Sequence, residues 1–273
     1  MFKFIKNNFS GKSREQFYEK ILSRTIKDTS ASILVCGGGV TDFDVFSRLG
    51  FNNVVISNLD IRNSEGEFYP FKWKLENAEH LSYEDNSFDY VVIHAAIHHA
   101  SSPHKVLTEM YRVCKRGFLA FESRDSFLMN IMEKLRLTET YETSAVFYND
   151  CKYGGVNNSS IPNYVYRWTE REIEKTIQAY APYYQHEYTY NYATAFPSLI
   201  GLKKNAILQS LFIYCFIPFY CLFKRILPRQ QNLFSFFVSK GHRDSCFPWL
   251  MWDEEAAKFV FNKNWSKSIF INK

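Results

Sequence analysis

Several patterns are missing from this sequence, and each absence excludes a class of protein. The six cysteines form no CxxC pair and have no metal-ligand spacing with the seven histidines, so we expect no metal site. The net charge is only +5, and Lys and Arg are scattered among Asp and Glu, which argues against a nucleic-acid partner. Residues 1–16 lack the apolar core of a signal peptide. We therefore expect a cytoplasmic protein with reduced thiols.

The first half of the chain alternates strand-like and helix-like segments. A polar helix is expected over residues 13–28. An apolar-striped helix is expected over residues 101–117, where Ser102 can cap and Pro103 can occupy the first turn. Strands alternating with helices of this length predict βαβ units, and therefore an α/β fold with a doubly wound, mostly parallel sheet. The strand-like runs are residues 32–36, 53–57, 71–75, 88–94 and 118–123.

The second half is less regular and rich in aromatic residues. Thr169, with Glu172 three positions later, forms a capping box that predicts a helix through about Ala181. Residues 186–196 and 232–240 have the composition and alternation of strands. The turn-rich segment between residues 152 and 168 is either a lid over a cleft or ordinary packing.

An 18-residue apolar stretch, residues 206–223, precedes the last expected strand. Its length is close to that of a membrane span, but Gln209 and Pro218 weaken this interpretation. We expect an inserted helical hairpin that caps an active site, forms a dimer interface or makes peripheral membrane contact. The expected organisation is an N-terminal helical segment (1–29), one domain (30–240) with an aromatic-rich insertion at about 200–230, and a C-terminal tail (241–273).

Three consecutive glycines, Gly37, Gly38 and Gly39, end the first strand-like run. Ligands of an open parallel sheet lie beyond the carboxyl ends of its strands, where glycine lets the backbone approach without side-chain collision. A tight turn without a ligand is the alternative. The dinucleotide fingerprint needs another glycine at position 42, but Asp42 stands there and would repel a pyrophosphate. A nucleoside cofactor without phosphates fits this charge better.

Polar side chains follow the second strand-like run. Asn58 and Asp60 lie about 20 residues beyond the glycines, where carboxylates or amides can hydrogen-bond both hydroxyls of a ribose. Turn chemistry is the alternative explanation for Asn58, because Asn and Asp are common where strands end. The distance from the glycines favours a role in ribose binding.

Three segments of the chain, taken in order, carry a family resemblance. They are ILVCGGG, LENAEHLSYEDNSFDYVVIHAAIHH and LTEMYRVCKRGFLAFE, all within residues 30–125. Together they resemble the successive motifs of class I S-adenosylmethionine-dependent methyltransferases, especially the type 11 group. The resemblance implies a Rossmann-like fold, in which a seven-stranded sheet has an antiparallel last strand, here expected at residues 232–240. It also implies S-adenosylmethionine as the cofactor.

The resemblance further implies roles for individual residues. The glycine turn would border the methionine part of the cofactor, the end of the second strand would hold the ribose, and two residues after the third strand would lie beside the adenine. The residue at the end of the fourth strand would lie beside the methyl group. In that order, the cofactor-binding residues are Gly37, Gly38 and Gly39, then Asn58 and Asp60, then Asn77 and Ala78, then His94.

This chain departs from the family at three acidic positions. The family carries acids before the glycines and at the positions of Asn58 and Asn77, whereas this chain has Val35 and the two amides. An amide oxygen still accepts a hydrogen bond from a hydroxyl or an exocyclic amine. Asp60 is the candidate to take over the ribose contact.

Histidines after the fourth strand-like run supply the candidate catalytic bases. Methyl transfer mainly requires alignment and exclusion of water, but a hydroxyl acceptor gains from a base whose pKa is near neutral. We assign this role to His98 first and to His94 second, while a structural role is the alternative for each. His98 and His99 are adjacent, but no acid or thiol lies at helical or strand spacing, so metal binding is not expected.

The predicted function is S-adenosylmethionine-dependent O-methylation of a small molecule, a glycan or a lipid-linked saccharide. The glycan is suggested by the resemblance of the insertion and of residues 246–265 to methyltransferases of surface glycan assembly. Glu122, Arg124 or Asp125 is expected over the acceptor, although Asp125 or Ser126 can instead cap a helix. The main alternative is a non-catalytic binding or scaffold protein, and a nicotinamide oxidoreductase is a third possibility.

Overall fold

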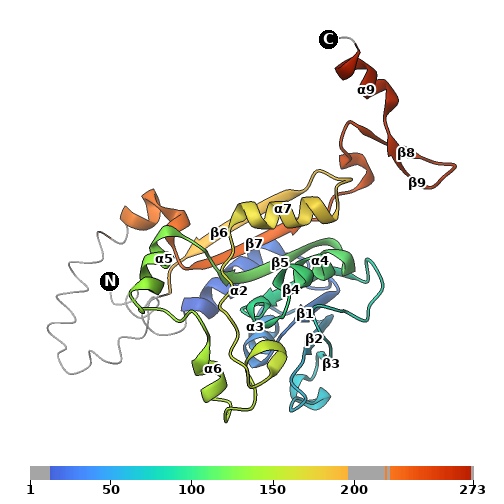
Figure 1. The fold of residues 1–273 in the computed structure, drawn as a ribbon. Coiled ribbons are helices and arrows are strands. Elements are labelled where there is room, and N and C mark those ends of the chain that lie inside the picture. Colours follow the sequence, from blue (N-terminus) through green and yellow to red (C-terminus); the bar gives the residue numbers. More distant parts are fainter. Residues whose placement is uncertain (1–12, 196–218, 220–221, 272–273) are drawn as a thin grey trace.

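A seven-stranded sheet forms the centre of the molecule, and a computed structural model describes residues 13–195, 219 and 222–271 (Figure 1). The strands are β1 (Ile33–Cys36), β2 (Val54–Asn58), β3 (Lys72–Leu75), β4 (Phe88–His94), β5 (Cys114–Ser123), β6 (Glu187–Ala193) and β7 (Leu233–Ser239). Their order is β3-β2-β1-β4-β5-β7-β6. Strands β1 to β5 are parallel, and β7 runs antiparallel to both β5 and β6. This arrangement confirms the predicted sheet and its antiparallel last strand.

Helices cover both faces of the sheet because the inner strands are apolar on both sides. In β1, Ile33 and Val35 belong to one buried core, while Leu34 and Cys36 belong to the other. The alternation of a fully buried strand thus supplies both layers with apolar surface. The helices that line these cores are α2 (Ser13–Thr25) and α3 (Val40–Arg48) on one face, and α4 (Pro103–Val113) and α7 (Glu170–Tyr180) on the other.

The junction between α4 and β5 differs from the expected one. The sequence pattern extended the helix to residue 117, but the helix ends at Val113 and the strand begins at once with Cys114. Lys240, which follows β7, donates from Nζ to the carbonyl oxygens of Tyr111, Arg112 and Cys114 at 2.7, 3.1 and 2.8 Å. A cation at a helix C-terminus satisfies carbonyls that have no partner within the helix. The C-terminus of α4 is therefore stabilised by Lys240, a residue that is distant in sequence.

Helix capping follows the sequence at two of the three predicted positions. The Thr169 hydroxyl accepts a hydrogen bond from the Glu172 N–H at the start of α7 (3.3 Å), and Ser126 caps α5 (Phe127–Lys134) in the same way. The Ser102 side chain makes no capping bond to α4. Its backbone N–H instead donates to Glu79 at 2.8 Å, so the turn before α4 is fixed by that carboxylate.

The two ends of the described chain differ in how they join the body. Helix α2 is part of the core, because Tyr18 and Leu22 are fully buried beneath the sheet. The C-terminal elements β8 (Leu250–Asp253), β9 (Lys258–Phe261) and α9 (Lys263–Phe270) instead project away from the body (Figure 1). The ring of Tyr183 stacks on that of Phe259 at 5.4 Å where this tail meets the domain.

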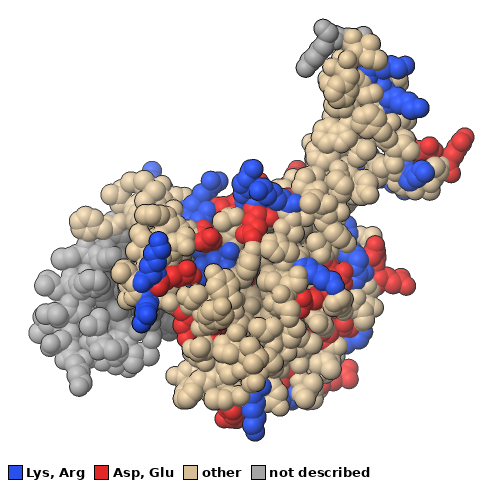
Figure 2. Space-filling view, viewed as in Figure 1, with Lys and Arg blue, Asp and Glu red and all other residues tan. Residues whose placement is uncertain are grey.

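Most of the expected insertion, residues 206–223, lies outside the described residues. Within residues 13–195, 219 and 222–271, no helix is both long and apolar enough to cross a membrane. On the face drawn in Figure 2, Lys and Arg lie among Asp and Glu over the body. The shorter helical elements used below are η2 (Ile97–His99), α6 (Thr143–Phe147), η3 (Val156–Asn158) and η5 (Pro228–Gln230).

Candidate active site

Two cavities lie beyond the carboxyl ends of the parallel strands, where the sheet order changes direction. The β2 cavity has a volume of about 330 Å³, and its lining includes Gly37, Asn58 and Glu76 at the ends of β1, β2 and β3. The β5 cavity has a volume of about 260 Å³, and its lining includes His94 and Glu122 at the ends of β4 and β5. Ala95 lines both cavities. The two spaces therefore adjoin at the end of β4.

The glycine turn serves the protein's own packing at two of its three positions. Gly37 has a φ of +61°, and a Cβ there would lie 2.5 Å from the Cβ of Ala96. A Cβ on Gly38 would lie within 3 Å of the Val35 and Ile56 side chains. A Cβ on Gly39 would meet nothing within 4 Å. Of the three glycines, Gly37 lines the β2 cavity, and Gly39 is the position at which a side chain would enter open space.

Asp42 is turned into the protein. Its carboxylate accepts hydrogen bonds from the Gly39 N–H at 2.9 Å and from the Tyr18 hydroxyl at 2.8 Å, and only 4% of the residue is exposed. Burial raises the pKa of Asp42, while nearby His94 acts in the opposite direction. Asp42 thus fills the anion-binding position at the start of α3 with a carboxylate of the protein itself.

The two candidate ribose ligands, at and just after the end of β2, have different hydrogen-bonding roles. The Asn58 side chain donates to the Gly38 carbonyl at 2.8 Å and accepts from the Asp60 N–H at 3.2 Å, so it holds the turn together. Asp60 lines the β2 cavity and is paired with Arg62 at 2.6 Å. The hydrogen bond from Arg62 lowers the pKa of Asp60. Oδ1 of Asp60 accepts from the backbone N–H and Nε of Arg62 at 3.0 and 2.8 Å, and Oδ2 accepts from Nε and Nη2 at 3.1 and 2.6 Å, so Arg62 occupies most of the acceptor positions of this carboxylate.

The walls of the β2 cavity contain both expected and unexpected residues. Asn77 and Ala78 line it as expected, and the Asn77 side chain also accepts the Glu79 N–H at 2.9 Å in a turn. Glu76 lines it too, held by Lys74 at 3.0 Å, and sequence reasoning missed this carboxylate. Several further unexpected lining residues come from the segment before and within η3: Gly154, Gly155, Asn157 and Asn158.

The segment predicted as either a lid or packing lines a cavity with one part and packs in the core with another. Its first part lines the β2 cavity, as described above, whereas Trp168 at its end is fully buried in the core. Arg167 lines the β5 cavity and forms an ion pair with Glu133. Its turn-rich composition was the signal that could have indicated the lining role.

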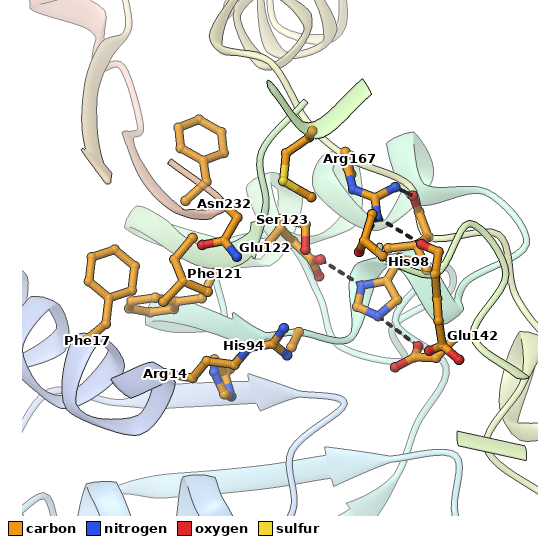
Figure 3. Close-up of a pocket in the computed structure, with 17 residues that line it drawn as sticks. Arg14, Phe17, His94, His98, Phe121, Glu122, Ser123, Glu142, Arg167 and Asn232 are labelled. Carbon is orange, nitrogen blue, oxygen red and sulfur yellow. Dashed lines mark hydrogen bonds and ion pairs between the residues drawn. The ribbon is translucent and has the colours of Figure 1, made fainter. Parts of the chain in front are cut away.

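A buried carboxylate orients His98 in the β5 cavity (Figure 3). Glu122 accepts the Ile97 N–H at 2.8 Å with one oxygen and lies 2.7 Å from His98 Nδ1 with the other. On the opposite side, His98 Nε2 lies 3.3 Å from Glu142. Burial lowers the pKa of His98, but the two carboxylates outweigh it and raise the pKa to about 10. Both ring nitrogens of His98 thus face carboxylates, Nδ1 facing Glu122 and Nε2 facing Glu142.

His94 has the opposite electrostatic character. It lines the β5 cavity, whereas the resemblance had placed it against the cofactor as well as the acceptor. Its ring stacks on Tyr18 with centroids 4.4 Å apart. Burial lowers the pKa of His94, and the Asp42 carboxylate only partly offsets this. The imidazole is therefore neutral at pH 7 and can accept a proton.

Of the three residues expected over the acceptor, only Glu122 lines the β5 cavity. The Arg124 guanidinium is instead buried against Glu170 at 2.6 Å, and Asp125 contacts Asn130 at 3.3 Å. The side chains that sequence reasoning missed come from distant or irregular parts of the chain and carry no motif. They include Arg14, Phe17, Glu142 and Asn232.

The chain was compared with protein families, curated proteins and solved structures. Residues 49–121 match the family model of the methyltransferase domain, while no curated protein matches the chain significantly. A SAM-dependent methyltransferase and possible histamine N-methyltransferase from Thermotoga maritima aligns at 14% identity and a TM-score of 0.50, over 84% of this chain and 91% of its own. The PH0226 protein from Pyrococcus horikoshii aligns at 15% identity and a TM-score of 0.50, over 84% and 90%.

The same fold also occurs in a protein that is named for a different activity. The 4+2 cyclase SpnF aligns at 12% identity and a TM-score of 0.50, over 83% of this chain and 81% of its own. These structural likenesses show a shared fold. The family match indicates a methyltransferase domain within residues 49–121, and the sheet order together with these likenesses shows a Rossmann-like methyltransferase fold.

Proposed function

We propose that the protein transfers a methyl group to an oxygen atom of a small molecule or glycan, with the cofactor in the β2 cavity and the acceptor in the β5 cavity. S-adenosylmethionine supplies a methyl group on a sulfonium, and this carbon is already activated for displacement. The observation that carries the proposal is the meeting of the two cavities at Ala95, with Asp60 in the first and the neutral His94 in the second.

The residues of the β2 cavity fit an adenosyl group. Asp60 offers carboxylate oxygens to the ribose hydroxyls, and Asn77 and Ala78 line the part of the cavity beyond β3. Gly37 brings bare backbone to the cavity wall, as a close approach to a ligand requires. The helix start is already neutralised by Asp42, which favours a ligand without phosphates.

The residues of the β5 cavity favour an acceptor that is both polar and carbon-rich. Phe17 and Phe121 provide apolar walls, and Arg14 and Arg167 provide hydrogen-bond donors (Figure 3). Sugar rings combine apolar faces with hydroxyl groups and match this lining. His94 accepts the hydroxyl proton as the oxygen forms its new bond to carbon, and enclosure by the aromatic residues reduces access of water.

A lipid-linked acceptor is favoured by the surface beside the β5 cavity. Met129 of α5 lines this cavity, and the same helix exposes Phe127 on its outer surface. The Leu128 N–H of this helix donates to Gln230 of η5 at 3.0 Å, which places α5 beside the segment that follows the expected insertion. We propose that this side makes peripheral contact with a cytoplasmic membrane surface, since exposed apolar side chains favour such contact.

The experiment uses S-adenosylmethionine labelled in its methyl group and separate pools of small molecules, glycans and lipid-linked saccharides. Wild-type protein is expected to label a hydroxyl group in one pool. His94→Gln should lower the rate by about 10²-fold or more, as expected for loss of a general base, while binding of S-adenosylhomocysteine persists. His104→Gln is the matched control, because His104 contacts Glu172 and is absent from the lining of either cavity.

The second candidate is a protein that binds the cofactor without transferring its methyl group. It is favoured by Asn58, whose amide donates and accepts one hydrogen bond each within the turn, and by Asp60, which is already paired with Arg62. Binding of S-adenosylhomocysteine without labelling of any pool would support this candidate and contradict the proposed transfer.

A further inference from the structure

Three side chains from separate parts of the chain converge between the two cavities. His98 and His99 belong to η2, and Glu142 immediately precedes α6. One oxygen of Glu142 lies 3.3 Å from His98 Nε2 and 3.4 Å from His99 Nε2, and the three candidate ligand atoms all lie within 4.8 Å of one another. Sequence spacing offered the histidine pair no acidic partner, but the fold supplies one.

The two separations that involve the Glu142 oxygen match those around a bound metal ion. Zinc holds nitrogen and oxygen ligands at about 2.0–2.2 Å in tetrahedral geometry, so neighbouring ligand atoms lie about 3.3–3.6 Å apart. Both distances from the Glu142 oxygen fall in this range. A single carboxylate oxygen that contacts two imidazole nitrogens at these distances leaves space for an ion among the three atoms.

Glu122 provides a second and independent observation. Its carboxylate is fully buried and lies 2.7 Å from His98 Nδ1, on the side of the ring away from Glu142. This bond holds the proton on Nδ1 and directs Nε2 toward Glu142 and His99. Metal-binding histidines commonly have their second nitrogen bound to a carboxylate in this way. Glu122 itself is fixed by the Ile97 N–H at 2.8 Å.

We propose that His98, His99 and Glu142 form a binding site for a divalent transition-metal ion, with zinc as the best match, and that Glu122 orients His98 within it. Two imidazoles and one carboxylate suit zinc and related ions, whereas magnesium prefers oxygen ligands. Three protein ligands leave at least one position open, as in metal sites that bind a substrate.

The location gives this site a role in the proposed methyl transfer. His98 and Glu142 line the β5 cavity, while His99 lines the β2 cavity, so the ion lies in the wall between them. An acceptor hydroxyl bound to the open position would lose its proton more readily, because a metal ion lowers the pKa of a bound hydroxyl. The proton passes to His94. This role rests on the proposed function, but the existence of the metal site does not.

The test measures zinc binding to the full chain without any cofactor or acceptor. Protein stripped with a chelator is titrated with zinc chloride by calorimetry, and one ion per chain is expected. His99→Gln and Glu142→Gln should each weaken zinc binding at least 10-fold. Glu139→Gln is the matched control, because Glu139 lines the same cavity and loses the same charge but is not one of the converging ligands.

Glu122→Gln tests the orienting bond and should weaken zinc binding about 10- to 100-fold. Circular dichroism checks that each variant is folded, and Cys151→Ser, which removes an exposed thiol, should bind zinc like the wild type. Absence of stoichiometric binding by the wild type would overturn the proposal. Binding that is equally strong in His99→Gln, Glu142→Gln and Glu139→Gln would overturn it too. A separate titration with S-adenosylhomocysteine distinguishes failure of this site from failure of the proposed function.

Discussion

The β2 and β5 cavities lie at the same edge of one sheet but are built in different ways. The β2 cavity is shaped mainly by glycine backbone, turn-forming amides and the Asp60 carboxylate. The β5 cavity contains the buried Glu122, together with Glu142 and Arg167 from segments far along the chain. The first cavity combines local turns with lining residues from the segment before and within η3, whereas the second depends on ion pairs formed between distant segments. Changes to these two kinds of structure should therefore have separable effects.

The largest expected effect is a loss of stability on substitution of Arg124, which follows β5. Arg124→Met leaves the Glu170 carboxylate buried without its 2.6 Å partner, which should reduce the free energy of unfolding by about 3 kcal/mol. Urea denaturation measures this loss. Affinity of the folded variant for S-adenosylhomocysteine should remain at the wild-type value, because Arg124 does not line the β2 cavity.

The control is an ion pair of similar geometry on the surface. Arg48 pairs with Glu15 at 2.6 Å, but the Arg48 side chain is 44% exposed. Arg48→Met should therefore cost less than about 1 kcal/mol. Equal losses from Arg124→Met and Arg48→Met would contradict the view that buried ion pairs hold the β5 side together.

The next effect concerns the β2 cavity. Asp60→Ala removes the carboxylate assigned to the ribose, and calorimetry should show affinity for S-adenosylhomocysteine weakened by about 2 kcal/mol, or about 30-fold. Asp44→Ala, at an exposed position on α3, is the matched control and should bind like the wild type. Unchanged affinity in Asp60→Ala would remove Asp60 from the cofactor site.

Tyr18 contacts both the glycine turn and the β5 cavity, and its substitution should reduce stability by a smaller amount. Its hydroxyl bonds to Asp42 beside the glycine turn, and its ring stacks on His94 in the β5 cavity. Tyr18→Phe keeps the stacking but removes a buried hydrogen bond, so the free energy of unfolding should fall by about 1–2 kcal/mol. Tyr69→Phe, at a residue that is 80% exposed, should change nothing measurable in the same denaturation experiment.

The smallest expected effect is a dependence of stability on pH. Because burial lowers the pKa of His94 in the folded protein, the unfolded chain binds a proton there first as the pH falls below the ordinary value of 6.5. The stabilising contribution is thus complete above pH 6.5 and declines below it. His94→Gln should lose less stability than the wild type between pH 7.5 and pH 5.5 in urea denaturation. An identical loss in both proteins would contradict a neutral His94.

The sequence predicted the β2 cavity better than the β5 cavity for a physical reason. Gly37, Asp60 and Asn77 each follow a short strand-like run, and the carboxyl ends of adjacent parallel strands necessarily meet. Local patterns were therefore sufficient to bring them together. Patterns also predicted helices on both faces of the sheet, because β1, β2, β4 and β5 are apolar runs or have an apolar centre.

Glu142 and Arg14 could not be predicted in this way. Glu142 precedes a five-residue helix without periodicity, and its backbone N–H donates to the carbonyl of the distant Asn163 at 2.9 Å. Arg14 reaches the β5 cavity because α2 packs under the sheet. The metal-binding arrangement was missed because its third ligand depends on the same long-range packing.

The central claim, that S-adenosylmethionine binds in the β2 cavity beside the glycine turn, is tested most directly by titrating the protein with S-adenosylhomocysteine in a calorimeter. We predict one binding site per chain in the wild type. We also predict loss of that site in Gly39→Val, since a side chain at position 39 would enter open space rather than the protein's own packing. Absence of heat with the wild type at high ligand concentration, or unchanged affinity in folded Gly39→Val, would contradict the claim.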